Sequence, residues 1–215
     1  FRGSDLAFAN LEFPLGERGQ VRAGRTPEFF HDAALIPALR RAGVTVLSLA
    51  TNHMMDCGPE GLARTLEACA REGIHAVGAG PDLAAARRPA RFEIRGLRVC
   101  ILAYAQSVGD AARKDAPGVA PLDSELIEEV LRRWRPETDL LVVSAHWGSM
   151  YIDYPPPRVL ETAKRLSAAG ANVVLGHHPH VLQGAAHLGR TLVLYSLGDA
   201  VFNSRAGDFR ASVGS

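Results

Sequence analysis

The sequence predicts an α/β fold built on a parallel or mixed sheet. Short apolar runs rich in Val, Ile and Leu alternate with segments of helical period, which is the pattern of α/β domains. Gly43, Gly73 and Gly170 each follow a predicted helix and precede a predicted strand, where a left-handed residue commonly ends a helix. At 215 residues the chain suffices for one well-buried core, so residues 1–215 are expected to form a single domain.

The predicted strands are the apolar runs bounded by turn signals. In chain order they are Leu6–Ala9, Val44–Leu49, Ile74–Val77, Ala90–Ile94, Val99–Ala103, Leu140–Ala145, Val173–Leu175 and Leu192–Ser196. Gly96 predicts a hairpin turn between the fourth and fifth of them. The predicted helices are Ala33–Arg41, Pro59–Arg71, Asp82–Ala86, Ser124–Trp134 and Pro157–Ala169. The polar stretch Gly109–Pro121 predicts a loop or insertion.

Composition and charge exclude several classes of protein. The 24 Lys and Arg residues balance 23 Asp and Glu residues, and no one-signed block appears, so a scaffold for nucleic acid is not expected. No apolar run approaches the roughly 20 residues that span a bilayer, so no membrane contact by these residues is expected. The three cysteines predict reduced thiols rather than a disulfide framework. The start at Phe1 and the end at Ser215 favour a fragment truncated at both ends.

Residues with catalytic or ligating side chains gather directly after predicted strands, where open α/β sheets place their sites. The clusters are Asn10-Leu11-Glu12, Asn52-His53 with Asp56, His146-Trp147-Gly148, His177-His178-Pro179-His180 and, more weakly, Ser196-Leu197-Gly198-Asp199. A lone histidine after a strand is more often structural, but three within four residues favour a metal site. Imidazoles combined with the Glu12 carboxylate and the Asn52 amide suit a hydrolytic transition-metal centre better than Ca²⁺ or Mg²⁺.

The spacing within the clusters allows further predictions. In an extended segment His178 and His180 would point to the same face, and Pro179 favours extended geometry at His178. Asp56 could accept a hydrogen bond from His53 and fix its tautomer, or it could cap the helix that begins near Pro59; the two roles are compatible. The Trp147 indole either stacks on a ligand or packs in the core.

Five segments together resemble the CapA family, the bacterial capsule synthesis proteins associated with poly-γ-glutamate. They are Asn10-Leu11-Glu12-x-Pro14-Leu15, Asn52-His53-x-x-Asp56-x-Gly58, His146-Trp147-Gly148, His178-Pro179-His180-Val181-x-Gln183 and Tyr195-Ser196-Leu197-Gly198. The resemblance covers nearly all of the chain in order. It implies a calcineurin-like metallophosphoesterase fold, an α/β/β/α sandwich, with two divalent metal ions (Mn, Zn or Fe).

The resemblance also implies a role for each matching residue. Catalytic roles fall to His53, near the leaving group, and to Asp56. Metal ligands would be Glu12, Asn52, His146, His178 and His180. Beside what the resemblance implies, substrate contacts are expected from Asn10, Trp147 and Asp199. The chain departs from the family pattern at Thr51, Met150 and Asp199, and the family's opening Gly-Asp motif would lie before Phe1.

These features predict a metal-dependent, phosphoesterase-like hydrolase associated with poly-γ-glutamate capsule synthesis. Two alternatives stand beside it, because poly-γ-glutamate contains amides and no phosphate. One is a γ-glutamyl hydrolase or transferase at the same site, and the other is a non-catalytic component that binds the polymer or capsule-synthase partners. By resemblance, the parent protein would be membrane-anchored or at the cell surface.

Overall fold

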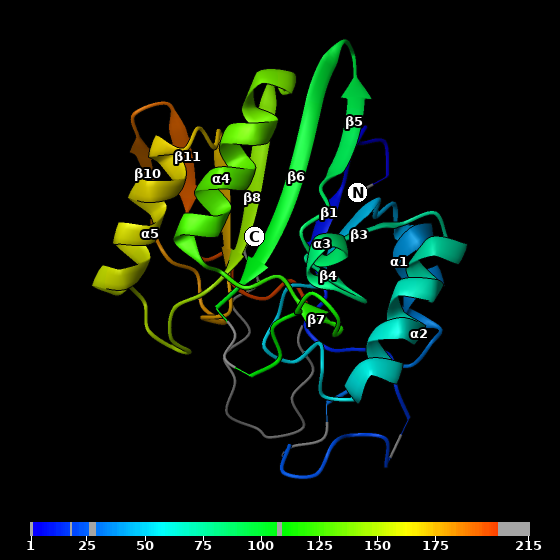
Figure 1. The fold of residues 1–215 in the computed structure, drawn as a ribbon. Coiled ribbons are helices and arrows are strands. Elements are labelled where there is room, and N and C mark those ends of the chain that lie inside the picture. Colours follow the sequence, from blue (N-terminus) through cyan, green and yellow to red (C-terminus); the bar gives the residue numbers. More distant parts are fainter. Residues whose placement is uncertain (1, 18, 26–28, 107–108, 202–215) are drawn as a thin grey trace.

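The computed structural model describes residues 2–17, 19–25, 29–106 and 109–201. Two sheets pack face to face, and helices cover the outer face of each (Figure 1). Helices α1 (Leu35–Ala42) and α2 (Gly58–Arg71) lie on one side, and α4 (Ser124–Trp134) and α5 (Pro157–Ala168) lie on the other. The α/β class and the four-layer arrangement expected from the sequence are therefore confirmed.

The smaller sheet has three parallel strands in the order β1-β2-β3. They are β1 (Phe8–Asn10), β2 (Val46–Ser48) and β3 (His75–Val77). In register, Phe8 pairs with Val46, and Val46 pairs with His75. Because the strands are parallel, their carboxyl ends, and the loops that follow β1 and β2, lie at the same edge.

The larger sheet has six strands in the order β10-β11-β9-β8-β6-β5. They are β5 (Ala90–Ile94), β6 (Leu97–Ala105), β8 (Leu140–His146), β9 (Val173–His177), β10 (Ala185–Leu188) and β11 (Thr191–Leu194). The four central strands are parallel, and β5 and β10 pair antiparallel at the two edges. The remaining short elements are β4 (Ala79–Gly80), α3 (Leu83–Ala86), β7 (Gly118–Val119) and the 3₁₀ helix η1 (Arg135–Glu137).

The core has two parts, one on each face of the six-stranded sheet. Along β6, Ile101 and Ala103 face the three-stranded sheet, whereas Leu102 and Tyr104 face α4 and α5. Adjacent strand residues point to opposite faces, so a strand buried on both faces is apolar throughout. This explains the continuous apolar run that marks β6 in the sequence.

The predicted elements are present, with shifted boundaries at several ends. The backbone φ is positive at the three glycines that follow helices, as predicted for residues that end helices. It is 101° at Gly43, 66° at Gly73 and 100° at Gly170. The hairpin between β5 and β6 is also confirmed, with positive φ at Arg95 and Gly96. Strands β4, β7 and β10 were missed by the sequence analysis; β10 is an edge strand of Ala-Ala-His-Leu, a composition with little strand propensity.

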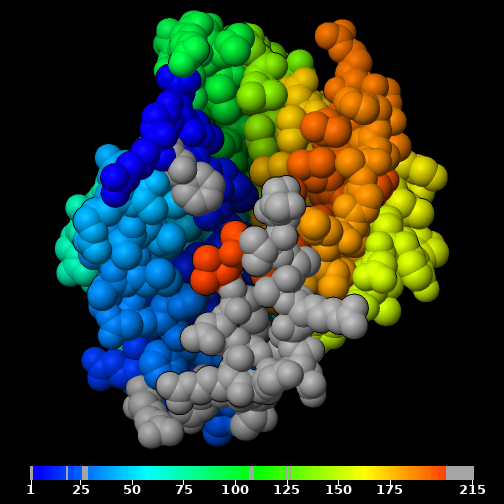
Figure 2. All heavy atoms as spheres, turned by 180° about the vertical axis from the view of Figure 1, so that it is seen from behind, coloured from blue at the N-terminus to red at the C-terminus, as the bar shows by residue number. Residues whose placement is uncertain are grey.

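The three cysteines are buried thiols, as expected for a chain without a disulfide framework. No helix in the described part of the chain has the length and apolar character needed to cross a bilayer. From the opposite side, the blue N-terminal segments and the orange C-terminal segments occupy opposite flanks of one face (Figure 2). Segments distant in sequence therefore border the same face of the molecule.

Candidate metal centre

The predicted ligands lie at the carboxyl ends of strands from both sheets. Glu12 follows β1 by two residues, His146 is the last residue of β8, and His178 comes directly after β9. His146 pairs in register with His177, which brings His178 to the same edge. The Thr51 hydroxyl donates to the Glu12 carbonyl oxygen at 2.7 Å and so ties the loop after β2 to the loop after β1. Parallel strand ends thus assemble the site, as in other open α/β sheets.

Glu12, His146 and His178 form a group suited to hold a metal ion. One ligand atom from each lies within 4.8 Å of the others. Nε2 of His146 is 3.4 Å from Oε1 of Glu12 and 2.7 Å from Oδ1 of Asn52. A carboxylate, two imidazoles and an adjacent amide oxygen form the mixed donor set that divalent transition metals accept.

Several polar atoms of this group are buried and have no hydrogen-bond partner among the described residues. They are Oε1 of Glu12, Nδ1 of His146 and Nδ1 of His178, together with Oδ1 of the neighbouring Asn10. A buried polar atom without a partner costs free energy, and such atoms rarely gather in one place without a reason. A bound cation would satisfy acceptors of this kind, so the residues present fit a divalent metal.

Burial also sets the protonation of the group. It raises the pKa of Glu12 to about 7, against the opposing charges of His180 and His53. Burial lowers the pKa of His178 to about 4 and that of His146 well below its usual range, and neighbouring histidines add to both shifts. Both imidazoles are therefore neutral at neutral pH, which is the form that coordinates a metal.

The backbone around His178 differs from the extended geometry predicted from sequence. His178 has a φ of 98° and His180 a φ of 57°, so both lie in the left-handed region. The prediction of an extended segment is wrong because β9 ends at His177 and the chain turns at once. Residues other than glycine rarely adopt such backbone angles, because each one costs about 1–3 kcal/mol of conformational free energy. Backbone strain of this kind tends to persist at functional sites.

His180 lies beside the three-residue group. Its Nδ1 is 3.0 Å from Oδ1 of Asp199, and its ring centroid is 6.0 Å from that of His178. Burial opposes protonation of His180, but the hydrogen bond and the charge of Asp199 outweigh it and raise the pKa of the imidazole. Asp199 is thus placed against a histidine of the site.

A histidine–carboxylate pair lies at the edge of the centre. Nδ1 of His53 is 2.7 Å from Oδ2 of Asp56, whose side chain is only 1% exposed. The rings of Phe13 and Phe29 flank His53 at 5.1 and 5.8 Å. Helix α2 begins at Gly58 with Cys57 at its N-cap position. Of the two roles open to Asp56, the geometry therefore supports orientation of His53 and not helix capping.

Comparison with known proteins places the chain in a family. Residues 1–204 match the bacterial capsule synthesis protein family PGA_cap. The chain belongs to this family. It is 33% identical over 207 residues to the PGA biosynthesis protein CapA of Bacillus subtilis, covering 94% of this chain and 54% of that protein. It is 35% identical over 213 residues to a “Probable polyglutamine synthesis accessory protein” of Mycobacterium tuberculosis, covering 92% and 56% of the two chains.

The CapA-family chain thus spans about half the length of the curated relatives it matches. Among solved structures, the sulfate thiohydrolase SoxB of Thermus thermophilus has a similar fold, with a TM-score of 0.54 and 16% identity over 78% of this chain and 30% of SoxB. A hypothetical protein of the same species gives a TM-score of 0.52 with 21% identity over 75% and 56%. These similarities confirm the metallophosphoesterase-like fold of this CapA-family chain.

Of the residues expected to contact substrate, Trp147 lies in the core of this CapA-family structure and Asn10 lies in the candidate site. Trp147 is 1% exposed, and its indole N–H donates to the carbonyl oxygen of Tyr195 at 2.9 Å, so its side chain packs in the core. This corresponds to the core alternative and leaves no face of the indole open to a ligand. Asn10 lies within the site, where its amide donates to Oε2 of Glu12 at 2.9 Å.

The sequence analysis missed three charged residues near His53: Arg22, Arg25 and Asp110. Nε of Arg25 is 3.3 Å from Oδ1 of Asp56, and Asp110 pairs with both arginines. They fall in polar loops with no motif spacing, and Asp110 is 85 residues beyond Arg25. No local pattern could have joined them.

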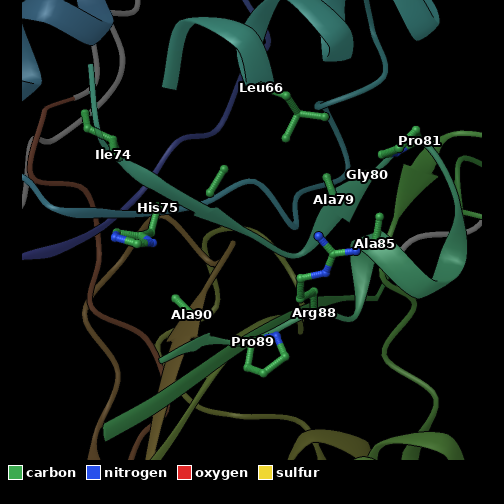
Figure 3. A pocket seen from close by; sticks show the side chains of 11 residues that line it. Leu66, Ile74, His75, Ala79, Gly80, Pro81, Ala85, Arg88, Pro89 and Ala90 are labelled. Atoms are coloured by element: carbon green, nitrogen blue, oxygen red, sulfur yellow. The ribbon is translucent and has the colours of Figure 1, made fainter. Parts of the chain in front are cut away.

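A pocket of about 370 Å³ lies elsewhere in this CapA-family fold, and none of the predicted site residues lines it. Figure 3 shows its mostly apolar wall, with His75 and Arg88 at its polar margin. The lining comes from α2, β3, β4, α3 and the start of β5. The metal group therefore does not coincide with this cavity.

Proposed function

We propose that residues 1–215 act as one metal-dependent hydrolase domain of the capsule synthesis family. The observation that carries the proposal is the group of Glu12, His146 and His178, whose ligand atoms converge from two sheets to within 4.8 Å. Three protein ligands in a mixed N/O set are typical of catalytic metal sites that keep a position open for water or substrate. The similarity to a thiohydrolase is one of fold and adds only an analogy to this proposal.

In this proposal each side chain of the site has a separate role. Glu12, His146 and His178 would hold the metal, with Asn52 and His180 as further ligands if two ions bind. A divalent metal at such a site polarises the scissile group and lowers the pKa of water. In its doubly protonated form His53, whose Nδ1 is held by Asp56, would give the proton on Nε2 to the leaving group. Asn10 would orient Glu12.

The proposed substrate is a phosphoester, the class that the metallophosphoesterase-like fold favours. One observation favours a second candidate, a γ-glutamyl hydrolase or transferase. The group found among the described residues is one glutamate with two histidines, a set that single-zinc peptidases use on amides. Relatives of this chain are named for biosynthesis of an amide-linked polymer. A binding role in capsule assembly, with capsule-synthase partners, is the third outcome.

Metal analysis followed by two assays separates these functions. The purified protein would be analysed for bound Mn, Zn and Fe and assayed with bis(p-nitrophenyl) phosphate and with γ-glutamyl p-nitroanilide. Metal-dependent release of nitrophenol that is lost in His178→Ala supports the phosphoesterase. Release of nitroaniline alone supports the amidase. Bound metal without turnover of either substrate would contradict a hydrolase and favour the binding role.

A further inference from the structure

A closed ring of contacts runs through Asp56, Arg22, Asp110 and Arg25. The backbone N–H of Arg22 donates to the carbonyl oxygen of Asp56 at 2.8 Å. The Arg22 guanidinium donates to Oδ1 of Asp110 at 2.8 Å, and Arg25 donates to Oδ2 of the same carboxylate. Nε of Arg25 returns to Oδ1 of Asp56 at 3.3 Å. The ring joins three segments of the chain behind one side chain.

This ring meets His53 at Asp56. Oδ2 of Asp56 contacts Nδ1 of His53, and Oδ1 lies 3.3 Å from Nε of Arg25 in an ion pair without hydrogen-bond geometry, so the two carboxylate oxygens face different groups. The Asp56 side chain is 1% exposed and that of Asp110 is 11% exposed, whereas the Arg25 and Arg22 side chains are 34% and 40% exposed. The carboxylates are thus buried while solvent partly screens their arginine partners. Removal of one member of a buried pair leaves the other charge uncompensated.

We infer that Arg25 is a positioning residue, which fixes the rotation of the Asp56 carboxylate and thereby the tautomer and direction of the His53 ring. Asp110 serves this role from the segment between β6 and β7 by holding the planar guanidinium of Arg25 in place. The inference rests on the proposed function, in which His53 gives a proton to the leaving group. According to this inference, proton transfer by His53 also depends on the loop that carries Asp110, which is distant in sequence.

The test compares Arg25→Met with a matched control, Arg64→Met. Arg64 is an arginine of α2, and it donates to Oε1 of Gln20 at 2.7 Å. Two aryl phosphodiesters would be assayed with metal, one with phenol and one with 2,4-dinitrophenol as the leaving group. Only the poor leaving group needs a positioned acid. We expect Arg25→Met to lower kcat for the phenyl ester about tenfold or more, with little change for the dinitrophenyl ester or in KM.

Two further variants keep the result decisive if Arg25→Met folds poorly. Arg25→Lys retains the charge and should recover part of the loss, and Asp110→Asn should reproduce a smaller selective loss. Equal losses for both esters, or no loss in Arg25→Met, would overturn the inference. Arg64→Met should behave like the wild type.

A spectroscopic measurement separates this inference from the proposed function. At fixed pH, ¹⁵N NMR of the metal-free protein should show the singly protonated form of His53 with its proton on Nδ1, and Arg25→Met should shift that form towards a mixture of tautomers. A mixture in the variant with no ester turnover in any protein would support the positioning role and refute the hydrolase. An unchanged tautomer in the variant would overturn the positioning role whatever the turnover.

Discussion

Nε2 of His146 lies 3.4 Å from Oε1 of Glu12, although the two residues belong to different sheets and are far apart in the chain. His146 ends β8 of the six-stranded sheet, and Glu12 follows β1 of the three-stranded sheet. Both side chains are largely buried, at 2% and 13% exposure. Their contact places the candidate metal centre where the two sheets meet.

Loss of the Glu12 carboxylate should weaken metal binding. Glu12→Gln keeps the size of the side chain but removes the anionic ligand, so affinity for Zn²⁺ or Mn²⁺ should fall about 100-fold or more. Titration calorimetry of the two proteins measures the change. The exposed Glu17→Gln variant is the matched control and should bind metal like the wild type; equal affinity in all three would contradict a role for Glu12 as ligand.

Loss of His53 should abolish turnover and leave the metal in place. His53→Ala removes the proposed acid, which contributes about 10²–10⁴ in rate. The readouts are kcat on phosphodiesters and metal content by elemental analysis. His187→Ala removes an exposed histidine of β10 and should change neither. If His53→Ala keeps full activity, the proposed acid is a different group.

Metal affinity should depend on pH through Glu12. Burial raises the pKa of this carboxyl to about 7, and the metal requires the ionised form. Below pH 7 the proton must therefore leave on binding, so affinity should fall about tenfold per pH unit down to about pH 5. His178, with a pKa of about 4, stays neutral over this range and adds no slope. Calorimetry at several pH values gives the slope of the logarithm of metal affinity against pH. In Glu12→Gln this slope should be smaller by one proton. A pH-independent affinity in the wild type would contradict this assignment.

Metal should stabilise the folded protein against heat. At a free metal concentration 100 times Kd, binding contributes about 2.7 kcal/mol, and a chain of this size gains about 2–4 °C in Tm per kcal/mol. Zn²⁺ or Mn²⁺ should thus raise Tm by about 5–10 °C, and EDTA should reverse the rise. Calorimetric scans of the wild type and His178→Ala measure it. An identical rise in the variant would mean that the metal binds elsewhere.

Trp147 should matter for stability and not for metal binding. Trp147→Phe leaves the carbonyl oxygen of Tyr195 without its buried donor and a gap beside Gly176, at a cost of about 1–3 kcal/mol in the free energy of unfolding. Urea denaturation gives this value. In Trp147→Phe, KM for any substrate found should stay within about twofold of the wild-type value. A large rise in KM with unchanged stability would instead show that the indole contacts substrate.

The longer apolar strands and the side chains that end them were predictable from sequence, because each depends on local signals, whereas β4, β7 and β10 were not. The apolar runs that become β6 and β8 are buried on both faces, and parallel strands carry His146 and His178 to one edge of the six-stranded sheet, while Glu12 follows β1 of the three-stranded sheet. Knowledge of neither register nor sheet order was needed, since the carboxyl ends of parallel strands meet at one edge in any order.

Other features depend on contacts that no local pattern records. The left-handed backbone at His178 and His180 arises from an immediate turn after β9, and the general preference before Pro179 pointed to extended geometry instead. Arg25 and Asp110 meet only because two loops fold against α2 and β7. The core position of Trp147 follows from its hydrogen bond to β11's continuation at Tyr195, which the sequence around Trp147 does not encode.

A crystal of the protein soaked in Mn²⁺ or Zn²⁺ and measured at the anomalous edge of that metal tests the metal centre most directly. We expect a strong anomalous peak bounded by Glu12, His146 and His178, with metal–ligand distances of about 2.0–2.2 Å. A peak held by other residues only, or no peak at these three side chains at a metal concentration that saturates known sites, would contradict the proposed metal centre.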